Sequence, residues 1–210
     1  IEDKYKFNSK SSIYEIIVRS SNVGSARLAL MVGKKGLKEI LSTLGLLEPV
    51  RLELREANST RPILPKNWHD ITLATVSYGY GMSVSLLHLA KAYAILGNGG
   101  LNIEPTILKK NHNSQSGSRV LKKTTSDEML KLLEAVVTDQ RGTARILRSK
   151  YYRIGGKTGT AEKISLEKKG YQKDKVVANF VGLFPLQEPR FVIAAFLDEP
   201  ENNLLQEPCR

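Results

Sequence analysis

The chain has 210 residues, enough for one hydrophobic core, and its 41% hydrophobic and 25% charged residues are typical of a globular protein. The formal net charge is +11, but the lysines are scattered and do not alternate with aromatic residues, which favours a solvated basic surface over a nucleic-acid site. One cysteine, Cys209, excludes an intrachain disulfide, and three histidines without ligand spacing argue against zinc, so we expect no metal and no cofactor.

The first part of the chain is predicted to be helical. Ser12 and Glu15 form a capping-box pattern that predicts a short helix, which ends at the turn "RSSNVG". Asn22 is the expected N-cap of the next helix, and a further helix follows Gly36 with leucine and isoleucine on one face. Residues 48–72 carry three prolines and little periodicity, so we expect a long surface excursion.

Two more helices are predicted in the middle of the chain. Ser83 or Ser85 is expected to cap the helix "LLHLAKAYAIL", which the following "GNGG" stops. A second capping-box pattern, Thr125 to Glu128, predicts the start of the helix that contains "MLKLLEAVV". Gly142 is the expected stop of that helix.

The last third has the pattern of strands. The stretches 151–163, 176–184 and 190–198 are short, rich in β-branched or aromatic residues, and bounded by proline, glycine or charge. Pro185 to Pro189 forms a turn that predicts an antiparallel hairpin, with the first strand beside it. Helices followed by a strand meander predict an α+β fold, with helices packed on an antiparallel sheet.

The stretch "GGKTGT" does not fit a phosphate-binding loop, because the first glycine of that motif would fall at Tyr151; "GYGMSV" likewise lacks the third glycine of a dinucleotide loop. In a strand, Lys157 and Gly159 would face one side, and Thr158 and Thr160 the other. At a sheet edge, Gly159 leaves room for a ligand backbone, and the edge N–H groups can stabilise a developing oxyanion.

The stretch Ser20-Ser21-Asn22 allows two interpretations. Serine and asparagine are ordinary N-cap residues, so the stretch can simply begin a helix. Alternatively, a hydroxyl and an amide two residues apart can face one cleft, where Ser20 passes a proton and Asn22 orients an amide substrate. The residues by themselves leave both interpretations open.

Taken together, these stretches resemble a known family. Ser20-x-Asn22 is followed by Lys157-Thr158-Gly159, two elements in the order found in penicillin-binding proteins. The phrases "SSNVGSARLAL", "YGYGMSVSLLHLAKAYAILGNGG", "GTAR" at 142–145 and "GGKTGTAEK" resemble class B penicillin-binding proteins, most closely the division (septal) type. The resemblance extends over nearly the whole chain.

The resemblance implies an activity and its site residues. Members of the family are D,D-transpeptidases: a serine attacks a D-Ala-D-Ala stem peptide, and an amine on a neighbouring stem takes the acyl group, while β-lactams trap the serine. It implies that Ser20 relays a proton, that Asn22 holds the substrate amide, and that Lys157 contacts Ser20 and sets a positive potential. It also implies that Thr158 and Thr160 bind the substrate carboxylate, with the Thr160 N–H in the oxyanion hole.

One family element does not precede Ser20 in the sequence. The nucleophile lies in an S-x-x-K motif upstream of S-x-N, and the sole match is Ser165-Leu166-Glu167-Lys168, which follows the KTG element and is interpreted as chance. We therefore expect residues 1–210 to be a partial transpeptidase domain, incomplete at both ends and lacking the S-x-x-K segment. By itself, this chain is predicted not to be acylated by substrate or penicillin.

Two other interpretations stay open. The chain can be a noncatalytic remnant or one half of a split protein that an upstream fragment with S-x-x-K completes. A basic nucleic-acid-binding domain is the alternative from another class, although no nucleic-acid partner is expected. The family is anchored in the inner membrane and faces outward, whereas this sequence shows no signal peptide and no apolar run of about 18 residues.

Overall fold

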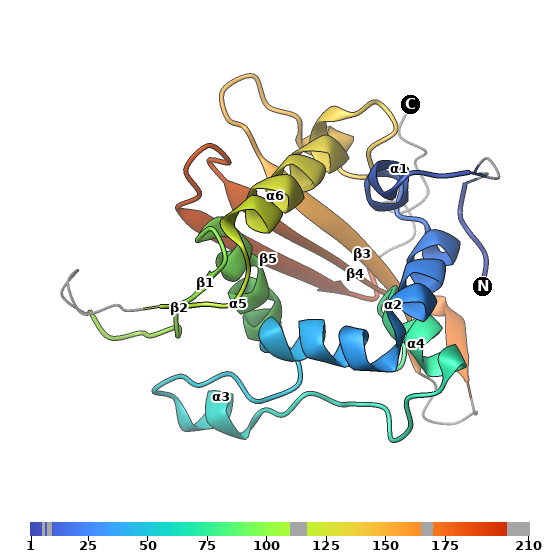
Figure 1. Cartoon of the computed structure of the whole chain (residues 1–210), viewed down its shortest axis with the longest axis horizontal. Helices are drawn as coiled ribbons and strands as arrows, with labels where there is room; N and C mark the ends of the chain where they lie inside the picture. Colours follow the sequence, from blue (N-terminus) through green and yellow to red (C-terminus); the bar gives the residue numbers. More distant parts are fainter. Residues whose placement is uncertain (6, 8–9, 110–116, 165–169, 201–210) are drawn as a thin grey trace.

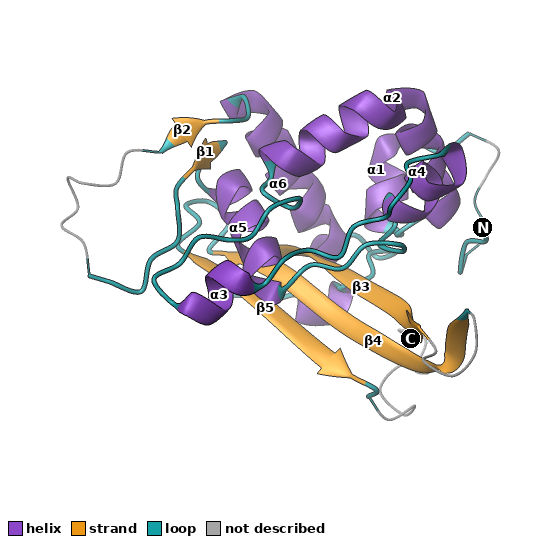
Figure 2. Ribbon diagram, turned by 90° about the horizontal axis from the view of Figure 1, so that it is seen from below, coloured by secondary structure: helices purple, strands orange, loops and turns teal. Residues whose placement is uncertain are grey.

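The structure is a computed structural model that describes residues 1–5, 7, 10–109, 117–164 and 170–200. Figure 2 shows three long strands in one layer, with most helices against one side of it. The predicted α+β fold is confirmed. Within the described residues, no helix combines the length and the apolar character that crossing a membrane requires.

The sheet is antiparallel and has the order β3 (Gly155–Ile164), β4 (Tyr171–Phe184), β5 (Phe191–Asp198). Strands β4 and β5 form the predicted hairpin, and β3 pairs with β4, which leaves β3 at one edge (Figure 1). The KTGT stretch lies on this edge strand, as predicted. A smaller two-stranded sheet, β1 (Leu101–Asn102) with β2 (Ser118–Arg119), was not predicted.

Two helices cover one face of the long sheet: α5 (Leu86–Gly97) and α6 (Lys123–Thr138). Leu133 of α6 packs with the buried Leu183 and Leu186. In a second cluster, Val136 and Val137 of α6 pack near Phe180 of β4. Each fully buried aliphatic side chain contributes about 1.5–3 kcal/mol, so this layer holds β4 in place, and β3 is positioned by pairing with β4.

The first helix packs against α6, and the second packs against the first and against α4 (Asp70–Val76). The helix α1 (Ile13–Val18) has the predicted capping box, in which the Ser12 hydroxyl accepts from the Glu15 N–H at 3.2 Å. The next helix, α2 (Asn22–Thr43), is capped by Ser21 instead of Asn22, so that expectation was wrong by one residue. The two helices predicted on either side of Gly36 form one run with a kink at Gly33, whose φ is 74°.

The connection after α2 is the predicted excursion, interrupted by the short α3 (Arg55–Ser59) and ending at α4 (Asp70–Val76) (Figure 1). Of the two caps predicted for α5, Ser83 and Ser85, the structure has Ser85, whose hydroxyl accepts from the His88 N–H. The cap of α5 agrees with the sequence pattern because the cap contact is local, only three residues long.

The start of α6 differs from the prediction. The helix begins at Lys123, so Thr125–Glu128 lies inside its first turns and does not cap it. Ser126 is fully buried and donates to the Leu96 carbonyl at the end of α5. Its hydroxyl satisfies a carbonyl of another helix, a tertiary contact that the local pattern does not reveal. Helix α6 ends at Thr138, and the predicted stop, Gly142, lies four residues further on.

Candidate functional site

The S-x-N and K-T-G stretches meet in the structure. The Lys157 ammonium donates to the Ser20 hydroxyl at 2.8 Å and to its neighbour's carbonyl, Thr158 O, at 2.9 Å. Ser20 lies in the connection between α1 and α2, and Lys157 lies on β3. Two motifs that are 137 residues apart in sequence therefore form one polar contact.

Ser20 has an unusual backbone that directs its side chain. Its φ is 56°, in the left-handed region, and its N–H donates to Ile17 O at 3.3 Å as α1 ends. For a residue with a β-carbon this conformation costs roughly 1–2 kcal/mol. Such strain is found where surrounding structure imposes it, often at functional sites. The turn ends α1 and leaves the Ser20 hydroxyl within reach of β3.

Lys157 has a shifted ionisation. Burial lowers the pKa of Lys157 from 10.5 to about 8, because an ammonium group loses hydration there. A lysine with this pKa is mostly charged at pH 7 but releases its proton more readily than a surface lysine. It can therefore supply positive potential and also exchange a proton with the hydroxyl that it contacts.

Thr158 points to a different partner. Its hydroxyl donates to the hydroxyl of Thr143 (Oγ1 to Oγ1, 2.8 Å) in the loop that follows α6. Successive strand side chains alternate, which is why Lys157 reaches Ser20 while Thr158 reaches Thr143. Thr143 lies in the "GTAR" phrase, but a threonine after a glycine carries no distinctive signal, so the sequence alone gave it no role.

Gly159 was predicted to leave room for a ligand backbone, and the structure adds a second reason for a glycine here. A β-carbon at Gly159 would lie 2.5 Å from Asn179 Oδ1 on the neighbouring strand β4. A larger residue here would therefore displace the Asn179 side chain. The proposed room for a ligand backbone along this edge stays a prediction.

The edge of β3 presents backbone donors. The Glu162 N–H donates to the Tyr80 hydroxyl at 2.9 Å, so it points away from β4. Because N–H directions alternate along a strand, the N–H groups of Thr158 and Thr160 point to the same edge. Thr160 is an exposed residue on this strand. Tyr80 belongs to the "YGYG" phrase and packs edge-on against Tyr171, another contact that the sequence did not reveal.

Asn22 is held by the N-terminal segment. Its side-chain amide donates to the Glu2 carbonyl at 3.3 Å, in the first turn of α2. The adjacent Ser21 is buried and donates to Asp3 Oδ2 at 2.9 Å, while Asp3 Oδ1 accepts from Val23 N–H at 3.1 Å. In the described residues, no hydrogen bond joins Asn22 to Ser20 or Lys157. Asn22 is therefore near the contact in sequence, and its amide has a separate partner.

Two hollows of the described surface, of about 450 and 540 Å³, adjoin Trp68 and share Lys34 and His69. None of the predicted site residues lines either hollow, so hydrogen-bond geometry identifies the candidate site and cavity size does not. Where the structure describes the chain, no cluster of three or more His, Cys, Asp or Glu side chains is arranged to hold a metal. The Ser165–Lys168 match lies outside the described residues.

Comparison with known proteins gives one family. The family model "Penicillin binding protein transpeptidase domain" matches residues 2–207. The probable peptidoglycan D,D-transpeptidase FtsI of Caulobacter vibrioides is 36% identical, over 97% of this chain and 35% of the relative's length. The probable peptidoglycan D,D-transpeptidase PenA of Neisseria flavescens is 34% identical, over 90% of this chain and 46% of its own length. The chain thus spans less than half the length of these two relatives.

Solved structures agree with these relatives. The apo transpeptidase domain of Burkholderia pseudomallei penicillin-binding protein 3 has a TM-score of 0.86 at 35% identity, covering 95% of this chain and 60% of that one. Penicillin-binding protein 3 of Mycobacterium tuberculosis, solved with ampicillin, has a TM-score of 0.83 at 26% identity, covering 95% of this chain and 48% of that one. Since the family model matches nearly the whole sequence, the chain belongs to the penicillin-binding protein transpeptidase family.

Proposed function

We propose that residues 1–210 are the C-terminal part of a division-type D,D-transpeptidase domain that cross-links peptidoglycan stem peptides. The observation that carries the proposal is the contact between Lys157 Nζ and Ser20 Oγ beside the edge of β3. The relatives of Caulobacter and Neisseria, both described as probable peptidoglycan D,D-transpeptidases, support it. Like the family, the protein would act outside the inner membrane.

The proposed roles follow from the chemistry of each group. The stem peptide lies along β3, where Thr158 and Thr160 bind its terminal carboxylate and the Thr160 N–H stabilises the oxyanion. The Ser20 hydroxyl passes a proton toward the leaving amine, and Lys157 replaces that proton because its pKa is lowered by burial. Asn22 holds the amide of the substrate. β-Lactams occupy the same edge because they mimic the D-Ala-D-Ala dipeptide.

The acyl-accepting serine is proposed to come from a segment with S-x-x-K that precedes Ser20 in the family. Residues 1–210 then bind ligand noncovalently, and acylation requires that further segment. A split protein, in which a separate chain supplies the segment, remains compatible with this proposal.

A labelling experiment tests the proposal. The 210-residue chain is mixed with fluorescent penicillin and, separately, titrated with an N-acetylated D-Ala-D-Ala peptide by calorimetry. We expect saturable peptide binding without stable label, and label only after an S-x-x-K segment from a family member is added. Lys123→Ala, which alters an exposed pair with Asp127 on α6, serves as the control. Stable labelling of the chain alone overturns the need for the further segment, and absence of peptide binding overturns the substrate assignment.

A further inference from the structure

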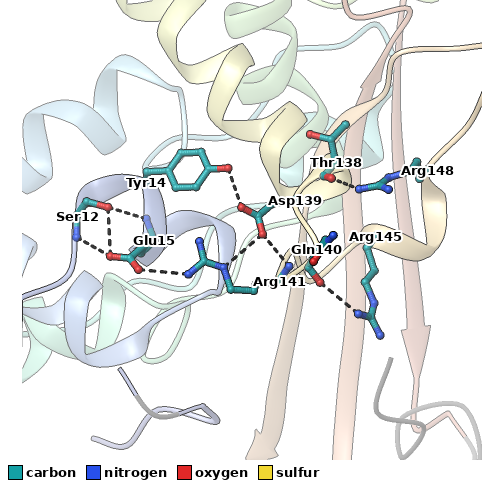
Figure 3. Close-up of polar contacts among 9 residues, drawn as sticks. All are labelled: Ser12, Tyr14, Glu15, Thr138, Asp139, Gln140, Arg141, Arg145 and Arg148. Carbon is teal, nitrogen blue, oxygen red and sulfur yellow. Dashed lines mark hydrogen bonds and ion pairs between the residues drawn. The ribbon is translucent and has the colours of Figure 1, made fainter. Parts of the chain in front are cut away.

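A cluster of polar contacts joins α1 to the loop that follows α6 (Figure 3). The Tyr14 hydroxyl donates to Asp139 Oδ2 at 2.9 Å, and the Arg141 N–H donates to Asp139 Oδ1 at 2.7 Å. The Arg141 side chain lies 3.5 Å from both Asp139 Oδ1 and Glu15 Oε1. One carboxylate therefore bonds both to a residue on α1 and to its own loop.

The carboxylate is the centre of this cluster. The pKa of Asp139 is lowered, chiefly by the backbone N–H of Arg141, against burial, with smaller contributions from Tyr14 and the Arg141 side chain. The pKa of Tyr14 is raised by burial and by its bond to Asp139. An ionised carboxylate and a neutral phenol are thus the favoured pair, and a charge-assisted hydrogen bond of this kind is stronger than a neutral one. The Arg141–Glu15 pair is more exposed and contributes little.

The loop that Asp139 anchors is tightly closed. The Gly142 N–H donates to Asp139 O at 3.0 Å, and a β-carbon at Gly142 would lie 2.2 Å from Val136 O. The Ala144 N–H donates to the same carbonyl, Val136 O, at 3.1 Å. Two arginines close the loop further: Arg148 donates to Thr138 O, and Arg145 donates to Gln140 O at 3.2 Å (Figure 3). The backbone has little room to move without breaking several of these bonds.

This loop carries Thr143 and is attached to α1 at a second point. The Thr143 N–H donates to Val18 O at 3.3 Å, one helical turn beyond Tyr14 on α1. The Thr143 hydroxyl accepts from Thr158 Oγ1 at 2.8 Å. Ser20, two residues after Val18, contacts Lys157. The short helix α1 is therefore connected to two adjacent residues of β3. Ser20, just after α1, contacts Lys157, and the loop held on α1 contacts Thr158 through Thr143.

The Thr143 and Thr158 hydroxyls can reverse their bond. Each hydroxyl can donate one hydrogen bond and can also accept hydrogen bonds. When Thr143 donates to Thr158, the Thr158 proton becomes available to a ligand carboxylate, provided the two oxygens stay at hydrogen-bond distance. We propose that Asp139 is a positioning residue for carboxylate recognition: by fixing the 139–144 loop on Tyr14 of α1, it holds Thr143 against Thr158. The inference rests on the proposed function, since it assumes that Thr158 meets a carboxylate.

The test compares two ligands that differ at one group. An N-acetylated D-Ala-D-Ala peptide and its C-terminal methyl ester are titrated by calorimetry against the 210-residue chain, Asp139→Asn and Tyr14→Phe. We expect the acid-over-ester affinity ratio to fall about five- to tenfold in Asp139→Asn, which loses one charged acceptor. Tyr14→Phe removes a single hydroxyl, retains the ring, and should lower the ratio about two- to fivefold. Asp127→Asn, in an exposed pair on α6, should leave the ratio unchanged.

Each outcome decides a different question. An acid-over-ester ratio that is unchanged in both Asp139→Asn and Tyr14→Phe overturns the positioning role and leaves the proposed function standing. An equal loss of affinity for acid and ester would mean that Asp139 only stabilises the fold, and this also overturns the inference. If the unaltered chain itself does not prefer the acid, the proposed function fails, and the inference fails with it.

Discussion

The two contacts of the KTGT strand differ in kind. Lys157 meets Ser20 through a half-buried ammonium whose pKa is lowered to about 8, whereas Thr158 meets Thr143 through two neutral hydroxyls. In the proposed function, the first contact sets the electrostatic potential of the site and its response to pH. The second contact carries no charge, so its proposed role is to orient a ligand. Neighbouring residues on one strand thus separate attraction from orientation, and the following predictions test that separation.

Loss of the ammonium should have the largest effect. Lys157→Met removes the charge and retains much of the side-chain volume, so the affinity for an N-acetylated D-Ala-D-Ala peptide should fall about 10- to 100-fold, because the peptide carboxylate loses a nearby opposite charge. Calorimetric titration measures it. Lys163→Met is the matched control, because Lys163 lies on the same strand but forms exposed ion pairs with Asp198 and Glu199. An equal loss in both variants would contradict a specific role for Lys157.

The pH dependence should separate the two contacts next. As pH rises through about 8, Lys157 loses its charge and the affinity for the peptide carboxylate should fall, with titrations from pH 6 to 10 giving the midpoint. Thr143→Val should weaken binding at every pH without moving the midpoint. A flat profile between pH 7 and 9 would rule out Lys157 as the source of the potential.

The same ionisation affects stability with a defined sign. Between pH 8 and pH 10.5 the unfolded chain keeps the Lys157 proton that the folded chain has released, so the free energy of unfolding should rise with pH in this window. Urea unfolding of the chain and of Lys157→Met at pH 7.5 and 10 measures the difference. The rise attributable to Lys157 should be absent from the variant.

Two substitutions at Ser20 should separate the effect of its backbone strain from the effect of its contact with Lys157. Ser20→Gly and Ser20→Ala both remove the hydroxyl that Lys157 contacts, so both should weaken peptide binding to a similar extent. Glycine accepts a φ of 56° without strain, so Ser20→Gly should be more stable than Ser20→Ala by roughly 1–2 kcal/mol in urea unfolding. Equal stabilities would mean that the turn relaxes in the variants.

The hydroxyl pair should give the smallest effect. Thr143→Val keeps the side-chain shape and removes one hydrogen bond, so the acid peptide should bind about fivefold more weakly, corresponding to about 1 kcal/mol. Thr143→Ser should restore most of the affinity because it restores the hydroxyl. Thr138→Val, which removes an exposed hydroxyl at the end of α6, is the control. Failure of serine to rescue would favour a packing role for Thr143.

How much of this could be read from the sequence depends on the range of each contact. The capping box of α1 was predicted correctly because Ser12 and Glu15 are three residues apart and bond to each other. The same pattern at Thr125–Glu128 misled, because α6 begins two residues earlier, at Lys123, and Ser126 inside it bonds to the Leu96 carbonyl 30 residues away. The pattern was equally good in both places, and only the surroundings of the helix differed.

The amino-acid pattern by itself determined the hairpin of β4 and β5, the placement of KTGT on a strand beside it, and the family. The tertiary structure alone decided that Thr143 is the partner of Thr158 and that Tyr14 bonds to Asp139 across 125 residues. Strand and cap patterns each involve only a few consecutive residues, so they can be recognised in the amino-acid sequence. A hydroxyl or a carboxylate finds its distant partner only when the packing of α6 on the sheet brings the two elements together.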